Sequence, residues 1–166
     1  MSTEPVVVVA AKRTPLGAFQ GVLSGAQSTD LGAAAIRACI AESGIDAGDI
    51  DEVLMGCVLP AGVGQAPARQ AALNANVPLS AGCTTLNKVC GSGMKATMLG
   101  NDLIKVGSAG IVLCGGMESM SNAPYLLPKA RSGYRMGHQQ VLDHMFFDGL
   151  QNPSDGNMMG YFAELT

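Results

Sequence analysis

Cys90 is the residue of this sequence whose type and position most clearly permit chemistry. It lies in the stretch TTLNKVCGSGMKATML, residues 84–99, where an apolar run that predicts a strand meets the glycine-spaced start of a predicted helix. A helix start presents unpaired N–H groups and partial positive charge, which favour a thiolate over a thiol. Gly91 and Gly93 leave room for an electrophile, and the N–H of Cys90 can stabilise an oxyanion on an acyl group attached to the sulfur. Cys90 is thus a candidate nucleophile, and burial as one more small apolar residue is the alternative interpretation.

The other cysteines and the histidines give weaker signals. The chain has five cysteines and no CxxC pair, so we expect reduced thiols and no disulfide framework. A thiol redox protein is a weak alternative, because no second cysteine lies close in sequence to resolve a sulfenate. His138 and His144 lie near Asp143 and Asp148, but no second cluster of ligands supports them, and we expect no metal site.

The composition indicates a globular protein and excludes several function classes. Of the 166 residues, 48% are hydrophobic and 14% are charged, with a net charge of -3. The ten Lys and Arg residues are scattered, which argues against a nucleic-acid partner. No apolar run reaches the roughly 18 residues of a membrane span, and the N-terminal charge order is wrong for a secretory signal. We therefore expect no membrane association and a cytoplasmic location, with a matrix-type compartment as the alternative.

The hydrophobic pattern predicts a layered α/β domain in which four strands alternate with three helices. The strands are expected at 5–15, 51–60, 83–89 and 109–119, and the helices at 28–45, within 61–78, and at 91–107. The order β-α-β-α-β-α-β favours helices packed against a mostly parallel sheet. The first helix can be capped by Ser28, Thr29 or Asp30, and Gly44 is expected to end it.

The sequence changes character after Met117. Pro, Gly and basic residues follow without clear periodicity, which indicates a long loop or the start of another unit. Short helices are expected within 139–150 and from about Met159. We expect one α/β domain over residues 1–118 and the beginning of a second unit over 119–166.

Several segments resemble the thiolases, the acyl-CoA C-acyltransferases. In chain order they are AAKRTPLGAFQG, GQAPARQAAL, NKVCGSGMKA, LCGGMESMSNAPYLLP, DGL and MMGYFAE. The similarity extends over essentially the whole chain, and the segment around Cys90 is specific. The ketoacyl synthases also use a cysteine between strand and helix, but GGMESMSNAPY favours a thiolase. The resemblance implies a thiolase-like layered fold, with residues 1–118 as the N-terminal α/β domain and 119–166 as the start of the loop domain.

The resemblance also assigns roles to individual residues. Cys90 matches the nucleophile that takes the acyl group as a thioester, and its N–H matches one donor of an oxyanion hole. Leu150, in DGL, and Met159, in MMG, match substrate-binding residues near the pantetheine arm and the acyl pocket, with ordinary core packing as the alternative. Acetyl-specific members often carry His where this chain has Met158, and Tyr161–Phe162 replace a smaller pair. A broader 3-ketoacyl range is therefore open.

Thiolases are more than twice as long as this chain. Their second half supplies a catalytic His, a second Cys and most of the CoA contacts, and none of those segments matches here. The resemblance implies thiolysis of 3-ketoacyl-CoA or condensation of acetyl-CoA, with CoA and acyl-CoA as substrates and no further cofactor. We expect the isolated chain to be inactive and to form a homodimer, a homotetramer or a complex with a C-terminal thiolase half. A non-catalytic, truncated or split chain that acts through assembly is the alternative.

Overall fold

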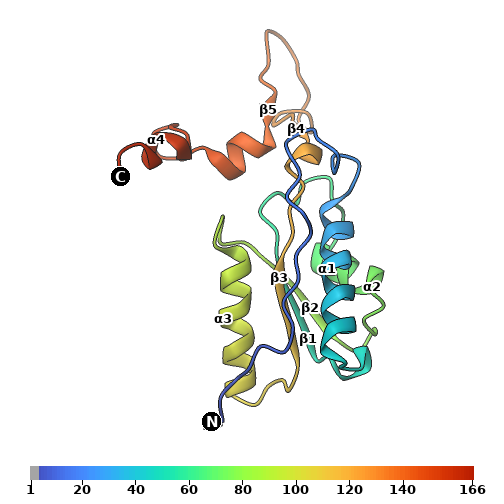
Figure 1. The fold of residues 1–166 in the computed structure, drawn as a ribbon. Helices are drawn as coiled ribbons and strands as arrows, with labels where there is room; N and C mark the ends of the chain where they lie inside the picture. Colours follow the sequence, from blue (N-terminus) through green and yellow to red (C-terminus); the bar gives the residue numbers. More distant parts are fainter. Residues whose placement is uncertain (1–3) are drawn as a thin grey trace.

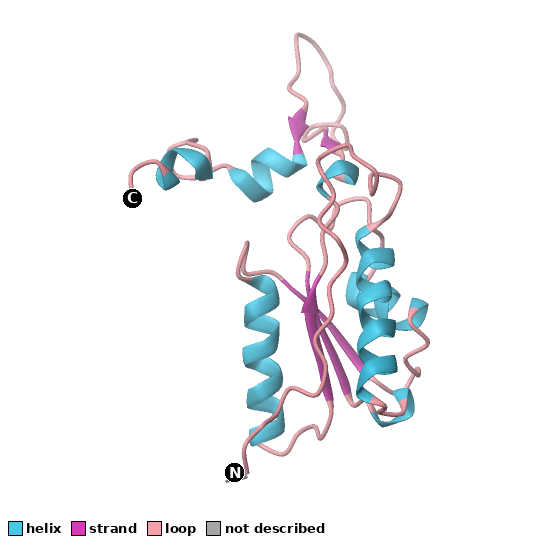
Figure 2. Cartoon of the chain, viewed as in Figure 1, coloured by secondary structure: helices cyan, strands magenta, loops and turns pink. Residues whose placement is uncertain are grey.

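A three-stranded parallel sheet with helices on both faces forms the centre of the molecule, whose computed structural model describes residues 4–166 (Figure 1). The strand order is β2-β1-β3, with β1 at Glu52–Gly56, β2 at Gly82–Leu86 and β3 at Val112–Gly116. Helices α1 (Ser28–Ser43) and α2 (Pro67–Asn74) cover one face, and α3 (Ser92–Lys105) covers the other (Figure 2). The predicted α/β class and the parallel sheet are confirmed.

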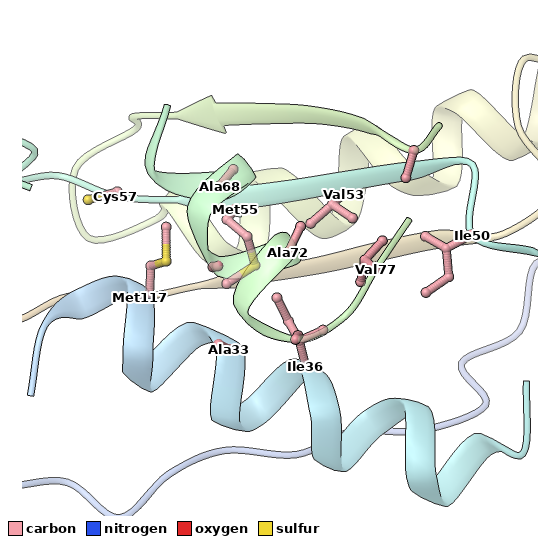
Figure 3. Packing of buried hydrophobic residues seen from close by; sticks show 13 residues of the cluster. Ala33, Ile36, Ile50, Val53, Met55, Cys57, Ala68, Ala72, Val77 and Met117 are labelled. Atoms are coloured by element: carbon pink, nitrogen blue, oxygen red, sulfur yellow. The ribbon is translucent and has the colours of Figure 1, made fainter. Parts of the chain in front are cut away.

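The main core lies between β1 and the pair of helices α1 and α2 (Figure 3). Ile36 and Val53 are almost fully buried there. Burying one such side chain contributes about 1.5–3 kcal/mol. The helix α2 meets the sheet and α1 through small side chains, which allow close approach: Ala68, Ala71 and Ala72. On the other face, a Cβ at Gly100 of α3 would overlap Cys114 Sγ of β3, so that helix also packs closely.

The prediction of a first strand over residues 5–15 is wrong. Residues 5–15 are extended but pair with no other strand of the described chain, and Val7 and Val8 are 69% and 79% exposed. The segment runs beside β3 (Figure 1), and Val9 and Ala10 line a groove together with residues 111–116. A β-branched run favours extended backbone, but a strand also needs hydrogen bonds to a neighbour. β3 is the edge strand of the sheet on this side, and within residues 4–166 it forms no ladder with the segment. The Lys12 side chain instead forms an ion pair with Glu42 of α1.

The ends of α1 agree in part with the sequence prediction. Gly44 ends the helix in the left-handed conformation, with φ of 68°. The N-cap, however, is Gln27, and its N–H donates to Asp30 Oδ2 over 3.4 Å. Asp30 thus accepts a hydrogen bond from the N-cap residue and lies within the first turn of the helix, while Ser28 and Thr29 are buried helical residues.

The start of the sheet is fixed by Asp51. Its Oδ2 accepts hydrogen bonds from the N–H groups of Gly110 (2.7 Å) and Ile111 (3.0 Å), which lie just before β3. The bonds from Ile111 and Gly110 lower the pKa of the Asp51 carboxyl below its ordinary value. The ionised carboxylate therefore joins the beginnings of β1 and β3.

The C-terminal part contains small elements instead of a continued sheet. A 3₁₀ turn at Met120–Asn122 leads into β4 (Tyr125–Leu126), which pairs antiparallel with β5 (Leu142–Asp143) around an exposed loop, 127–141. A π-helix at Met145–Leu150 and α4 at Met159–Ala163 follow. The helix expected near Met159 is confirmed, and the one expected within 139–150 is present as the π-helix. No helix within residues 4–166 is long and apolar enough to cross a membrane.

Candidate active site

Cys90 lies in the connection between β2 and α3, as predicted, and its side chain is exposed. Gly91 caps α3, which begins at Ser92. Two backbone bonds close the turn, from Gly91 N–H to Lys88 O (3.1 Å) and from Ser92 N–H to Val89 O (3.1 Å). The turn therefore holds the thiol at the start of a helix of 14 residues, where the first N–H groups have no partner within the helix.

The residue before Cys90 has a strained backbone. Val89 has φ of 47°, which is rare for a β-branched residue and costs about 1–3 kcal/mol. Neighbouring side chains hold it there: Asn87 Oδ1 accepts from Val89 N–H (2.8 Å), and the Ser92 hydroxyl donates to Val89 O (2.6 Å). Ser92 Oγ also accepts from Lys88 N–H (2.8 Å). These bonds fix the direction in which the chain presents Cys90.

Glycines bring the start of α3 directly onto the ends of two strands. A Cβ at Gly56, the last residue of β1, would lie 2.5 Å from Ser92 Cβ. A Cβ at Gly93 would lie 3.5 Å from Gly116 N at the end of β3. Because of this close approach, Cys90 lies beside the carboxyl ends of the parallel strands, where α/β folds commonly bind ligands.

A pocket of about 490 Å³ opens beside Cys90. Its wall is mostly apolar and comes from segments far apart in the sequence. They include the N-terminal segment at Lys12 and Arg13, the loop after β1, the end of β3, and the π-helix at Gly149 and Leu150. Leu150, selected from the sequence, thus shares a pocket with Cys90. Met159 is in α4, is partly exposed and is not among the residues that line this pocket.

Glu118 organises the floor of the pocket, and sequence reasoning did not select it. Its carboxylate accepts from Val58 N–H (2.8 Å), from Leu59 N–H (3.0 Å) and from the Cys57 thiol (3.7 Å). Burial, together with the nearby Glu118 charge, raises the pKa of Cys57 to about 11. Burial also raises the pKa of Cys114. A charged residue that directly follows an apolar strand was the available signal for Glu118.

His144 is a second polar residue whose position the sequence did not predict. It is 5% exposed, and its Nδ1 lies 2.5 Å from Asp148 Oδ2. Its Nε2 accepts from Ala61 N–H over 3.4 Å, in the loop after β1. Its observed contacts are therefore a carboxylate and a backbone amide.

Comparison with known proteins assigns the chain to one family. Residues 6–166 match the family described as "Thiolase, N-terminal domain". "Acetyl-CoA acetyltransferase" of Pseudomonas aeruginosa is 51% identical over 161 residues, which are 97% of this chain and 41% of that protein. "Acetyl-CoA acetyltransferase" of Schizosaccharomyces pombe is 49% identical over 165 residues, 99% of this chain and 42% of that protein. This chain therefore spans about two fifths of the length of these curated relatives, and it belongs to the thiolase family, matching its N-terminal domain.

Proposed function

We propose that this chain is the nucleophile-bearing part of an acyl-CoA C-acyltransferase, with Cys90 as the catalytic residue. The observation that carries the proposal is the position of Cys90. Of the five cysteines, all within the described residues, it is the exposed one, and it lines a pocket at the carboxyl ends of the strands. Cys57 is buried with a raised pKa, which supports assigning the chemistry to Cys90.

The proposed reaction proceeds in two steps through a covalent intermediate. The Cys90 thiolate attacks the 3-keto carbonyl of a 3-ketoacyl-CoA, and the C2–C3 bond breaks. Its electron pair remains on C2, which takes a proton, and acetyl-CoA leaves. The thiol of free CoA then gives up its proton and takes the acyl group from Cys90, whose sulfur leaves as thiolate. The reverse sequence condenses acetyl-CoA, and splitting one difficult step into two is nucleophilic catalysis.

The pocket supports a proposal for the substrate and for the binding residues. We assign Leu150 to the apolar wall that contacts the pantetheine arm or the acyl chain, because it lines the pocket beside Cys90. Met159 is proposed as a second contact from family resemblance, and in the described chain it lies outside this pocket. Met158 stands where acetyl-specific thiolases often carry His, so we propose an acyl range broader than acetoacetyl-CoA.

Assembly with further chain is part of the proposal. Val7, Val8 and Val9 of the N-terminal segment are exposed, and a groove lies between that segment and β3. Contiguous apolar surface of this kind is rare on soluble monomers. We propose a homodimer, a homotetramer or a complex with a C-terminal thiolase half, in the cytoplasm, with the domain boundary near residue 118. A compact, cooperatively unfolding monomer in light scattering and thermal denaturation would contradict the assembly.

The central test is complementation. This chain is supplied with a polypeptide matching the remaining part of the Pseudomonas aeruginosa relative; the pair is called the completed enzyme below. Thiolysis is followed as loss of 3-ketoacyl-CoA absorbance. We expect no turnover by the chain alone, because groups that act as a unit cannot be removed singly without losing most of the rate. We expect turnover by the completed enzyme.

The variants separate catalysis from assembly. Cys90→Ala should abolish turnover while the two polypeptides still co-purify. Cys39→Ala is the matched control and should retain turnover, since Cys39 is in α1 and does not line the pocket. Robust turnover by the chain alone would refute the role of the second part. A folded, associated pair without activity would favour the alternative of a non-catalytic, assembling chain.

A further inference from the structure

Among the hydrogen bonds that hold the loop after β1, those to Glu118 and to His144 come from two different parts of the chain. Glu118, from the end of β3, accepts from the N–H groups of Val58 and Leu59. His144 accepts from the N–H of Ala61, three residues after Val58. Val58 and Leu59 line the pocket that contains Cys90. The anchoring of this loop therefore determines the position of one pocket wall.

His144 has a fixed orientation in this arrangement. Since Ala61 N–H donates to Nε2, that nitrogen carries a lone pair, and the ring proton is on Nδ1, which donates to Asp148 Oδ2 over 2.5 Å. The ring is 5% exposed, and its backbone N–H donates to Pro124 O over 3.1 Å. A buried imidazole with a partner at each nitrogen has one orientation that satisfies both.

The same residue is also bonded to the π-helix, which forms another part of the pocket wall. His144 directly precedes the π-helix Met145–Leu150, and Asp148 is within it. A Cβ at Gly149 would lie 3.2 Å from Leu59 Cδ2, so the π-helix already contacts the loop at this point. π-Helical turns frequently occur at functional sites. Gly149 and Leu150 line the pocket together with Val58 and Leu59 of the loop, and the His144 bonds join these two parts of the wall.

We propose that His144 is a positioning residue that sets the width of the acyl pocket and thereby the acyl-chain length that Cys90 accepts. The proposal rests on the proposed thiolase function and deepens it. His144 does not line the pocket. It acts through Ala61 and Asp148, which fix Leu59 relative to Leu150. Without the bond to Ala61, the loop keeps its hydrogen bonds to Glu118, Asn87 and Gln70. None of these bonds joins the loop to the π-helix, so the two parts of the wall can separate.

Three variants of the completed enzyme test this role. His144→Ala removes both bonds, whereas His144→Gln places an acceptor at about the reach of Nε2 and retains the bond to Ala61. His138→Ala is the matched control, because His138 is the exposed histidine of the loop 127–141. Each variant is assayed for kcat and KM with acetoacetyl-CoA and with a longer straight-chain 3-ketoacyl-CoA. Hydrogen exchange of the peptide spanning residues 57–62 is measured in parallel.

The expected result is a change in selectivity. Loss of one hydrogen bond typically corresponds to a factor of about three to ten, so His144→Ala should change the ratio of the two kcat/KM values by about that factor in favour of the longer substrate, mainly through KM. Exchange in residues 57–62 should rise. His144→Gln should restore both readouts toward those of the unchanged protein, and His138→Ala should alter neither.

Two results would overturn the inference. One is an unchanged selectivity ratio in His144→Ala with the protein folded. The other is an equal loss of kcat for both substrates in His144→Ala and His144→Gln, which indicates a merely structural role. Failure of the proposed function itself looks different: the completed enzyme would then show no turnover, or turnover would survive Cys90→Ala. Hydrogen exchange of residues 57–62 in the three variants would still test the anchoring by His144.

Discussion

Alkylation of the native chain should label Cys90 far faster than Cys57. The two thiols have opposite environments. Cys90 is exposed at the turn before α3, whereas Cys57 is 2% exposed and donates to Glu118. The thiolate is the species that reacts with iodoacetamide, so a group that stays protonated reacts slowly even where the reagent can reach it.

The size of the effect follows from the pKa of Cys57. Burial first, and the charge of Glu118 second, raise this pKa from 9.0 to about 11. Two units correspond to about a hundredfold less thiolate than in an ordinary thiol at any pH below 9. Steric protection of a buried sulfur slows the reaction further. We therefore expect Cys57 to react at least about a hundredfold more slowly than Cys90 at pH 8.

The assay is a time course with iodoacetamide from pH 7 to pH 9, quantified for each cysteine by peptide mapping. Labelling in concentrated guanidinium chloride is the control, since all five thiols of the unfolded chain should then react at similar rates. Cys90→Ser should leave the four other native rates unchanged. Native labelling of Cys57 within a few-fold of Cys90 would refute both the buried environment of Cys57 and the selective exposure of Cys90.

Two further predictions concern the fold around the site and are measured on the completed enzyme. Gly56→Ala should destabilise it by about 1–3 kcal/mol in denaturant unfolding and slow acylation of Cys90, because the new Cβ collides with the start of α3. Gly160→Ala has open space around its Cβ and should stay within about 0.5 kcal/mol, and equal effects of the two substitutions would contradict the packing argument. The lowered pKa of Asp51 means that its carboxylate stabilises the fold above the ordinary value of 3.8 and that this contribution is lost as pH falls below it. The unfolding midpoint of Asp51→Asn should therefore fall less between pH 6 and pH 3 than that of the unchanged protein. Identical pH profiles would show that the Asp51 carboxylate does not contribute to the stability of the fold.

The sheet and its helices were predictable because each has a local signal. Short apolar runs bounded by turns marked β1, β2 and β3, and the segments between them, with the cap residues and Gly44 at α1, marked the helices that cover them. The strands are shorter than predicted because a ladder exists only where neighbours overlap, and Gly56 pairs in register with the ends of both β2 and β3. The prediction of a strand over residues 5–15 was wrong for the same reason. A preference for extended backbone does not specify a pairing partner.

The candidate site was predictable to a similar extent. The position of Cys90 between a strand and a helix was predictable because its signal is contained within a few residues, a strand end followed by glycines and a helix. Glu118 and His144 were missed because their partners are remote in sequence. Glu118 accepts from Val58 across a separation of 60 residues, and His144 accepts from Ala61 across 83. No periodicity or short motif reports such pairs.

The placement of Cys90 links stability to reactivity in this fold. The turn that presents the thiol depends on a strained Val89, and that strain is balanced by Asn87, Ser92 and the packing of α3 on the strand ends. Ser92 contributes twice, because it bonds the turn and also lies against Gly56 of β1. A substitution that loosens this contact lets Val89 relax to negative φ and changes the direction of Cys90 before the fold itself is lost. Substitutions in the core should therefore lower the reactivity of Cys90 even when the free energy of unfolding that they remove is too small to unfold the whole chain.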